Sequence, residues 1–208
     1  MWGALSTAWQ ISLEEAWAAF CAGTIAIGAV VTNPDGEVLA RGRNQITDFG
    51  TGAGLVRGHE LAHAELNTLL AFDRRRAAVG CTLYTTIEPC PLCLGAFYMS
   101  GIRSLAYAAR DPYAGSTNLL GATPYLRHKR IQVQHHPNES LETLAGGLFM
   151  AQEFRRYGWE DTNFRRAWRA VIPAAVALGE RLARSGLLVQ LAAQGAPAQA
   201  MVDEAERV

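Results

Sequence analysis

Two cysteines and one histidine in this chain have the types and the spacing of a metal site. Cys90 and Cys93 form a Cys-x-x-Cys pair, and His63 precedes Cys90 by 27 residues. Two thiolates and one imidazole fill three positions of a tetrahedral zinc ion and leave the fourth open for water, as in catalytic zinc sites. His59 stands four residues before His63, but no two of the other cysteines and histidines form a second Cys-x-x-Cys or His-x-x-x-His pair with each other: Cys21, Cys81, His59, His128, His135 and His136. His63, Cys90 and Cys93 are therefore the predicted ligands of a catalytic Zn²⁺.

A carboxylate, Glu65, lies two residues after the predicted histidine ligand. Zinc lowers the pKa of a bound water to about 7, so hydroxide is available near neutral pH. A carboxylate beside that water can accept its proton and pass it to a leaving nitrogen. Glu65 is therefore the predicted catalytic base and acid of a hydrolytic reaction.

Two other interpretations of the cysteine pair stay open. A Cys-x-x-Cys pair can act as a thioredoxin-like redox dithiol, and a zinc ion can merely stabilise an interaction module. The redox interpretation needs no metal partner, whereas His63 and Glu65 precede the cysteines here. A zinc hydrolase should turn over a substrate, and an interaction module should bind zinc without turnover.

The predicted elements place these side chains at the starts of two helices. Apolar periodicity predicts helices over residues 13–22, 63–75, 91–100 and 141–157, and strands over residues 25–32, 37–43, 81–87, 103–108 and 131–134. Strands separated by helices imply parallel pairs, and the first hairpin adds an antiparallel member. The expected fold is an α/β protein: a three-layer α/β/α sandwich with a five-stranded mixed sheet. Unpaired amides and the positive dipole end of a helix favour a thiolate at such a position.

The chain is predicted to consist of one domain and an appendage. Residues 1–160 are expected to form the domain that holds the zinc site, and residues 161–208 a C-terminal helical extension with a tail of low order. The Gly-rich segment 47–59 shows no periodicity and is expected to be a loop. Both this loop and the extension could close over the site.

The charge balance excludes one broad class of function. Lys and Arg number 19 and Asp and Glu number 19, so the formal net charge at pH 7 is zero and a bulk polyanion binder is disfavoured. No run of about 18 apolar residues exists that could span a bilayer, and the N-terminus lacks the basic segment of a secretory signal. The expected compartment is the reducing cytoplasm, without membrane partners.

The motifs together resemble those of the cytidine/deoxycytidylate deaminase-like superfamily. His63-Ala64-Glu65 followed by Pro89-Cys90-Pro91-Leu92-Cys93 is similar to its zinc signature. Residues 88–96 and Ala109-Arg110-Asp111 look most like the branch that holds bacterial guanine deaminases and tRNA adenosine deaminases. The resemblance spans roughly residues 13–157. It implies the cytidine deaminase-like fold, hydrolytic release of ammonia with Zn²⁺ as cofactor, and a homodimer.

The same resemblance suggests substrate contacts. Asn44 would hydrogen-bond the substrate, the carbonyl of Ala64 and the backbone amide of Cys90 would contact the departing amino group and the reacting water, and Asp111 and Tyr113 would lie at the substrate. Tyr113 is the better candidate for stacking on a base because it falls in a loop. Simpler roles are a strand-end turn for Asn44 and a loop carboxylate or cap for Asp111.

The sequence specifies the substrate less closely than the metal site, because the motifs resemble those of several branches of the superfamily. We expect an aminated nucleobase or nucleoside of the purine type, such as guanine or adenine, as a small-molecule partner. The alternative is a tRNA-specific adenosine deaminase that converts adenosine to inosine. Residues 127–184 hold ten basic and six acidic side chains, an excess that is modest for phosphate-dominated binding. The tRNA enzymes also end in a short basic helix, whereas this chain continues for some 50 residues.

Overall fold

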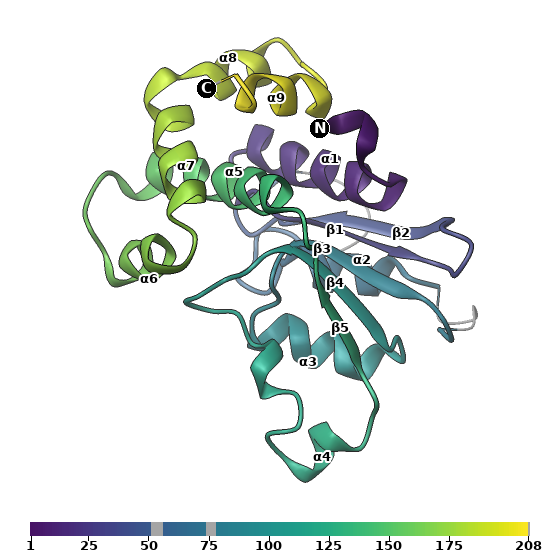
Figure 1. Ribbon diagram of the computed structural model, residues 1–208. Helices are drawn as coiled ribbons and strands as arrows, with labels where there is room; N and C mark the ends of the chain where they lie inside the picture. Colours follow the sequence, from purple (N-terminus) through teal and green to yellow (C-terminus); the bar gives the residue numbers. More distant parts are fainter. Residues whose placement is uncertain (51–55, 74–77, 208) are drawn as a thin grey trace.

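The computed structural model describes residues 1–50, 56–73 and 78–207, and a five-stranded sheet lies at its centre (Figure 1). The strands are β1 (Gly28–Thr32), β2 (Val38–Arg43), β3 (Thr82–Ile87), β4 (Ser104–Ala109) and β5 (Gln132–His135), in the spatial order β2-β1-β3-β4-β5. β1 pairs antiparallel with β2 and β3, whereas β3, β4 and β5 run parallel. The predicted mixed sheet is confirmed.

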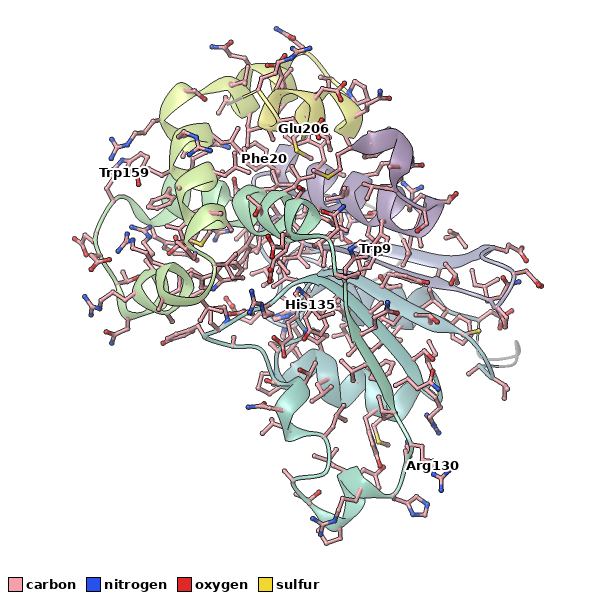
Figure 2. All side chains as sticks on the ribbon, viewed as in Figure 1. Trp9, Phe20, Arg130, His135, Trp159 and Glu206 are labelled. Atoms are coloured by element: carbon pink, nitrogen blue, oxygen red, sulfur yellow. The ribbon has the colours of Figure 1, made fainter. Side chains whose placement is uncertain are left out.

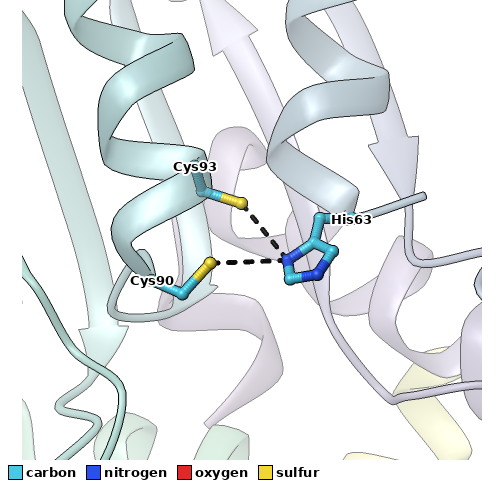
Figure 3. Close-up of side chains that lie close together, drawn as sticks. All are labelled: His63, Cys90 and Cys93. Carbon is cyan, nitrogen blue, oxygen red and sulfur yellow. Dashed lines mark hydrogen bonds between the residues drawn. The ribbon is translucent and has the colours of Figure 1, made fainter. Parts of the chain in front are cut away.

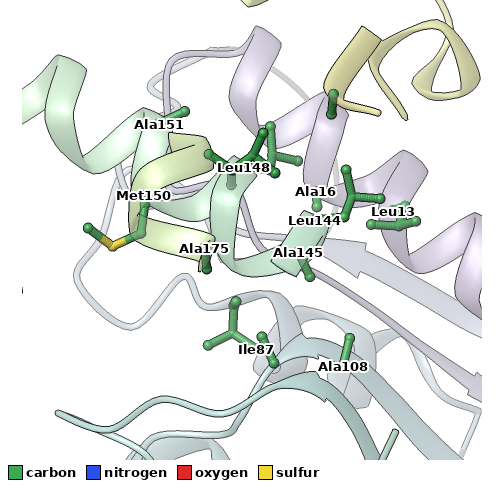
Figure 4. Packing of buried hydrophobic residues seen from close by; sticks show 14 of the residues in the cluster. Leu13, Ala16, Ile87, Ala108, Leu144, Ala145, Leu148, Met150, Ala151 and Ala175 are labelled. Carbon is green, nitrogen blue, oxygen red and sulfur yellow. The ribbon is translucent and has the colours of Figure 1, made fainter. Parts of the chain in front are cut away.

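Helices cover both faces of the sheet. One face carries α1 (Thr7–Cys21) and α5 (Glu139–Tyr157), and the other carries α2 (Ala64–Ala71) and α3 (Pro91–Ser100). Leu144 and Leu148 of α5 face α1 in the first of the two cores (Figure 4). Trp9 of α1 lies over the sheet, where its ring meets that of Tyr84 edge-on at 5.1 Å between centroids (Figure 2). The α/β/α sandwich is thus the observed fold.

The hairpin between β1 and β2 follows from its turn residues, Asn33-Pro34-Asp35-Gly36. The side-chain oxygen of Asn33 accepts hydrogen bonds from the backbone amides of Asp35 and Glu37. Gly36 has a φ of +82°, which a residue without a Cβ adopts at little cost. β2, the second strand of the hairpin, ends at Arg43, so Asn44 comes directly after a strand end.

Two helix boundaries differ from the prediction by more than two residues. α1 begins at Thr7, six residues earlier than expected, because Trp9, Leu13 and Trp17 follow one another on its buried face. α2 ends at Ala71 and Phe72 has extended backbone, whereas the predicted helix reached residue 75. Residues 74–77 and part of the predicted loop 47–59, residues 51–55, lie outside the described residues.

Beyond α5 the chain continues as helices that pack on the same core. They are α6 (Asn163–Val171), α7 (Pro173–Ser185), α8 (Leu187–Ala193) and α9 (Ala198–Ala205). Shorter helical segments elsewhere are η1 (Trp2–Ala4), η2 (Thr117–Leu119) and α4 (Pro124–Arg127). α7 lies against α5 at a close approach, where a Cβ built on Gly179 would stand 2.5 Å from the Cβ of Met150. Buried residues on both sides of the predicted boundary at residue 160 share one core, and that boundary stays a prediction.

The expectation of a low-order tail was wrong. Residues 198–205 form α9, whose Ala198, Met201, Val202 and Ala205 recur at helical spacing and are buried. The indole nitrogen of Trp17 on α1 donates a hydrogen bond to the carbonyl of Ala196, just before α9. The charged residues near the chain end masked this apolar face in the sequence pattern.

None of the helices in the described part of the chain combines the length and the apolar character needed to cross a bilayer.

Candidate active site

The three predicted metal ligands lie at the N-termini of two neighbouring helices. His63 is the N-cap residue of α2, Cys90 is the N-cap residue of α3, and Cys93 lies in the first turn of α3. Pro91 occupies the first position of α3, where its missing amide hydrogen costs no helical hydrogen bond. Both cysteines therefore lie at the positive end of the α3 dipole, which by itself favours the thiolate form.

The ligand atoms stand at distances that suit zinc (Figure 3). The Nδ1 atom of His63 lies 3.6 Å from the Sγ of Cys90 and 3.4 Å from the Sγ of Cys93. With a Zn–S bond of about 2.3 Å and a Zn–N bond of about 2.0 Å, two tetrahedral ligands stand roughly 3.5 Å apart. All three ligand atoms lie within 4.8 Å of one another, and this trio is the cluster found among the described residues. The donor set fits a zinc ion with an open fourth position.

Hydrogen bonding divides the protons between the two thiols. The pKa of Cys90 is lowered to about 4, mainly by a hydrogen bond from the Cys93 thiol. A hydrogen bond with His63 also lowers this pKa, whereas burial raises it. The same pairing with Cys90, together with burial, raises the pKa of Cys93. The hydrogen bond to Cys90 raises the pKa of His63 against the effect of its burial. Without metal the site thus holds protons that zinc must displace, since zinc binds thiolate and neutral imidazole.

Glu65 lies in the first turn of α2 with only 3% of its surface exposed. Its Oε2 accepts a hydrogen bond from the Cys93 thiol at 3.2 Å. Burial raises the pKa of Glu65. A carboxyl group with a raised pKa beside a metal site is suited to take up and return protons near neutral pH.

A cavity of about 190 Å³ opens beside these groups. The described residues that line it are Ile25, Ile27, Asn44, His63, Glu65, Ile87, Glu88, Cys90, Asp111, Ala114, Phe149 and Phe164. Asn44, Glu65 and Asp111, predicted from separate parts of the sequence, thus meet at one cavity. Ala64 and Tyr113 are not among its lining residues: Ala64 is buried with its carbonyl accepting from the Thr68 hydroxyl.

Asn44 is held so that its amide nitrogen remains available to a substrate. The side-chain oxygen accepts hydrogen bonds from the Thr24 hydroxyl at 2.6 Å and from the backbone amide of Ile46 at 3.1 Å. Only 1% of Asn44 is exposed, so its position is firmly defined. The side chain thus has the strand-end role, and its contact with a substrate stays a prediction.

Asp111 has the contacts of a loop cap. Its Oδ1 accepts from the backbone amides of Tyr113 and Ala114, each at 3.0 Å, and from the indole of Trp168 at 3.2 Å. Burial raises the pKa of Asp111. Tyr113 is 61% exposed and its ring meets Phe164 edge-on, with 5.5 Å between centroids. Both residues thus organise the wall of the cavity.

Glu88 lines the cavity, although the sequence analysis noted it only as the first residue of the motif at residues 88–96. Its Oε1 accepts from the backbone amide and the hydroxyl of Thr117, and its Oε2 accepts from the backbone amide of Asp111 at 3.3 Å. A Cβ built on Gly115 would stand 2.5 Å from Oε2. Glu88 therefore holds the loop of residues 111–117 in place beside Cys90.

Two aromatic side chains from beyond the zinc motifs complete the wall. Phe149 of α5 and Phe164 of α6 line the cavity. They belong to an aromatic cluster in which neighbouring ring centroids stand between 5.2 and 6.0 Å apart: Tyr113, Phe149, Phe164 and Trp168. Nothing in the local sequence pattern marked either phenylalanine, because helices distant in the sequence bring them to the site.

The comparison with protein families decides the relationship. Residues 4–109 match the cytidine and deoxycytidylate deaminase zinc-binding region. The chain belongs to this family. The matched residues include His63, Glu65, Cys90 and Cys93, so the match contains the whole predicted zinc motif.

The relatives of this chain differ in length. A tRNA-specific adenosine deaminase of Bacillus subtilis is 33% identical over 147 residues, which are 67% of this chain and 83% of that protein. A tRNA(Ile)-lysidine synthase of Deinococcus radiodurans is 40% identical over 100 residues, 44% of this chain, but the match spans only 15% of that longer protein. The structure of a guanine deaminase from Nitrosomonas europaea superposes with a TM-score of 0.55 at 25% identity, covering 72% of this chain and 84% of that one.

Proposed function

We propose that this chain is a zinc-dependent hydrolytic deaminase that releases ammonia from an aminated nucleobase or nucleoside of the purine type. The observation that carries the proposal is the buried Glu65 beside the His63, Cys90 and Cys93 cluster at a cavity of about 190 Å³. Three protein ligands with one open position and a nearby carboxylate are the parts that hydrolytic zinc chemistry needs.

The side chains present can perform the proton transfers of deamination. When bound, the metal supplies a Lewis acid that makes water nucleophilic near neutral pH. Glu65 takes the proton of that water and delivers it to the ring nitrogen next to the amino-bearing carbon. The oxygen of that water would bond to the amino-bearing carbon, and its second proton would pass through Glu65 to the amino group. The carbon–nitrogen bond then breaks, ammonia leaves and the carbon becomes a carbonyl. The amide of Asn44 donates to the base and fixes its orientation.

The walls of the cavity favour a small substrate. Phe149 and Phe164 come from α5 and α6 and narrow the space around Glu65. The zero net charge provides no electrostatic surplus for a tRNA backbone. A free base or nucleoside can enter such a site without an extended docking surface.

A tRNA-specific adenosine deaminase is the second candidate. The relative from Bacillus subtilis that carries this name aligns with 67% of the chain, which favours this candidate. A structured anticodon loop would have to reach a cavity whose wall includes Phe149 and Phe164. The role of a non-catalytic, zinc-stabilised interaction module is the third, and it differs from both by releasing no ammonia.

We further propose that the chain forms a homodimer through the outer face of α2 and α3. Leu70 and Met99 are 55% and 65% exposed there, beside a groove of about 330 Å³ with apolar walls. Exposed apolar patches of this kind commonly mark protein contacts. A second copy would cover the same residues on both subunits.

One assay separates the three functions. The zinc-loaded protein is incubated with guanine, adenine, cytosine, their nucleosides and an adenosine-containing anticodon hairpin, and ammonia is measured. We expect release from a free purine base or nucleoside. Release from the hairpin alone would establish the tRNA function, and no release from any of them would contradict the deaminase proposal.

A further inference from the structure

A second space lies directly beside the reaction cavity. It has a volume of about 230 Å³, and its described lining residues are Ile25, Phe149, Gln152, Glu153, Arg156, Tyr157 and Phe164. Ile25, Phe149 and Phe164 line both spaces, so the two meet at these three side chains. We call the second space the side chamber. None of the metal ligands lines it, so it lies on the side of these residues away from the zinc site.

The side chamber has largely apolar walls, and two of its charged lining residues have partners of their own. Glu153 pairs with the buried guanidinium of Arg165 at 3.0 Å. Arg156 donates to the Thr47 hydroxyl at 3.2 Å, and its guanidinium lies 5.5 Å from the centre of the Tyr157 ring. A sugar would need several hydrogen-bond partners in such a space, whereas a flat apolar group needs only contact with the rings.

We propose that the side chamber is a second substrate subsite, which takes an apolar, preferably aromatic, substituent carried by the ring in the reaction cavity. This inference rests on the proposed deaminase function and narrows its substrate class. In an aminopurine that presents its C6 amino group to the zinc site, N9 is at the far end of the ring system. A substituent on N9 is therefore the part that reaches past Phe149 and Phe164.

Equilibrium binding tests the subsite without needing turnover. The probes are 9-methyladenine and 9-benzyladenine, measured by calorimetry on zinc-loaded protein that carries Glu65→Gln. We expect 9-benzyladenine to bind at least about tenfold more tightly, since the benzyl ring removes apolar area from water in the side chamber. Equal affinities, or binding of neither probe, would overturn the proposal.

A pair of exposed tyrosines provides the variant and its control. Tyr157 lines the side chamber and is 60% exposed, whereas Tyr125 lines neither space and is 55% exposed. Tyr157→Ala should lower the ratio of the two affinities at least threefold, and Tyr125→Ala should leave it as it was. The same ratio in both variants would contradict the subsite.

The outcome is separable from that of the ammonia assay. Ammonia release from a free base together with equal affinities for the two probes would leave the deaminase function standing and remove the subsite. A tenfold preference that Tyr157→Ala reduces, without ammonia release from any base, would establish the subsite and remove the deaminase function.

Discussion

Three ligand atoms held at two helix N-termini define the chemistry of the site. His63 and Cys90 are N-cap residues and Cys93 is one turn further along α3, so backbone geometry places them before any metal binds. The low pKa of Cys90, about 4, means that one thiolate is ready near neutral pH. The second proton, on Cys93, is released only when zinc binds, which makes zinc affinity dependent on pH.

Removing one thiolate tests the metal site. Cys93→Ala should abolish stoichiometric zinc binding and lower the melting temperature, because two remaining ligands hold zinc weakly and metal binding contributes to folding. Zinc content measured by atomic absorption and thermal unfolding check this expectation. Cys21→Ala, at an exposed cysteine, is the control and should keep about one zinc per chain. Full zinc occupancy in Cys93→Ala would contradict the ligand assignment.

The sequence was informative about residues wherever a motif is local. His63 and Glu65 lie two residues apart, and the cysteine pair lies within one helical turn, so residue type and spacing were enough to predict that they meet. Phe149 and Phe164 could not be predicted, because their place in the cavity depends on how α5 and α6 pack. Residues that lie far from a motif in the sequence can be assigned to its site only from the tertiary structure.

At the scale of elements, an ion pair ties α5 to the end of β4. Arg110 follows β4, and its Nε donates to Oε1 of Glu142 in the first turn of α5 at 2.7 Å. Burial alone would raise the pKa of Glu142, but the hydrogen bonds and charge of Arg110 keep it below its ordinary value of 4.5. The contact holds the helix that carries Phe149 against the sheet.

This ion pair predicts a pH-dependent stability difference. A carboxyl group with a lowered pKa in the folded state stabilises the fold above pH 4.5, and the gain is lost as pH falls through the folded-state pKa. Glu142→Gln should cost about 1–2 kcal/mol of unfolding free energy near pH 7 and progressively less below pH 4.5. Urea unfolding at several pH values measures the difference. Glu139→Gln, at an exposed position in the same turn, is the control, and an equal loss in both variants would contradict this role.

The elements themselves were largely predictable, and the exceptions have physical reasons. β1 is buried along its whole length and β3 along most of it, so their apolar, β-branched runs were clear. α9 was missed because Asp203, Glu204 and Glu206 surround its narrow apolar face, which is buried by packing against η1, α1 and α8. Short helices draw their stability from such contacts more than from their own propensity.

For the whole molecule, the C-terminal helices extend one core and also reach the reaction cavity. Trp168 is fully buried in that core, and its indole holds Asp111 in the loop at the cavity wall. Phe164, one turn before it, lines the cavity and the side chamber. α6 therefore contributes both to the core and to the wall of the cavity.

The proposed dimer predicts a shift in molecular mass. Leu70→Arg places a charge on the exposed face of α2 and should convert a dimer into a monomer of 22.5 kDa. Sedimentation velocity of the wild type and the variant measures this. Val171→Arg, at a 42% exposed position on α6, is the control and should stay dimeric. A wild type that is already monomeric at the concentrations used would contradict the dimer.

The most direct test of the central claim is the turnover of Glu65→Gln at known zinc content. The variant should keep about one zinc per chain, because Glu65 is not among the three ligands. Its ammonia release from the best wild-type substrate should fall at least 100-fold, the order of magnitude that a lost proton carrier costs. A zinc-loaded Glu65→Gln protein that released ammonia at a rate near that of the wild type would contradict the account.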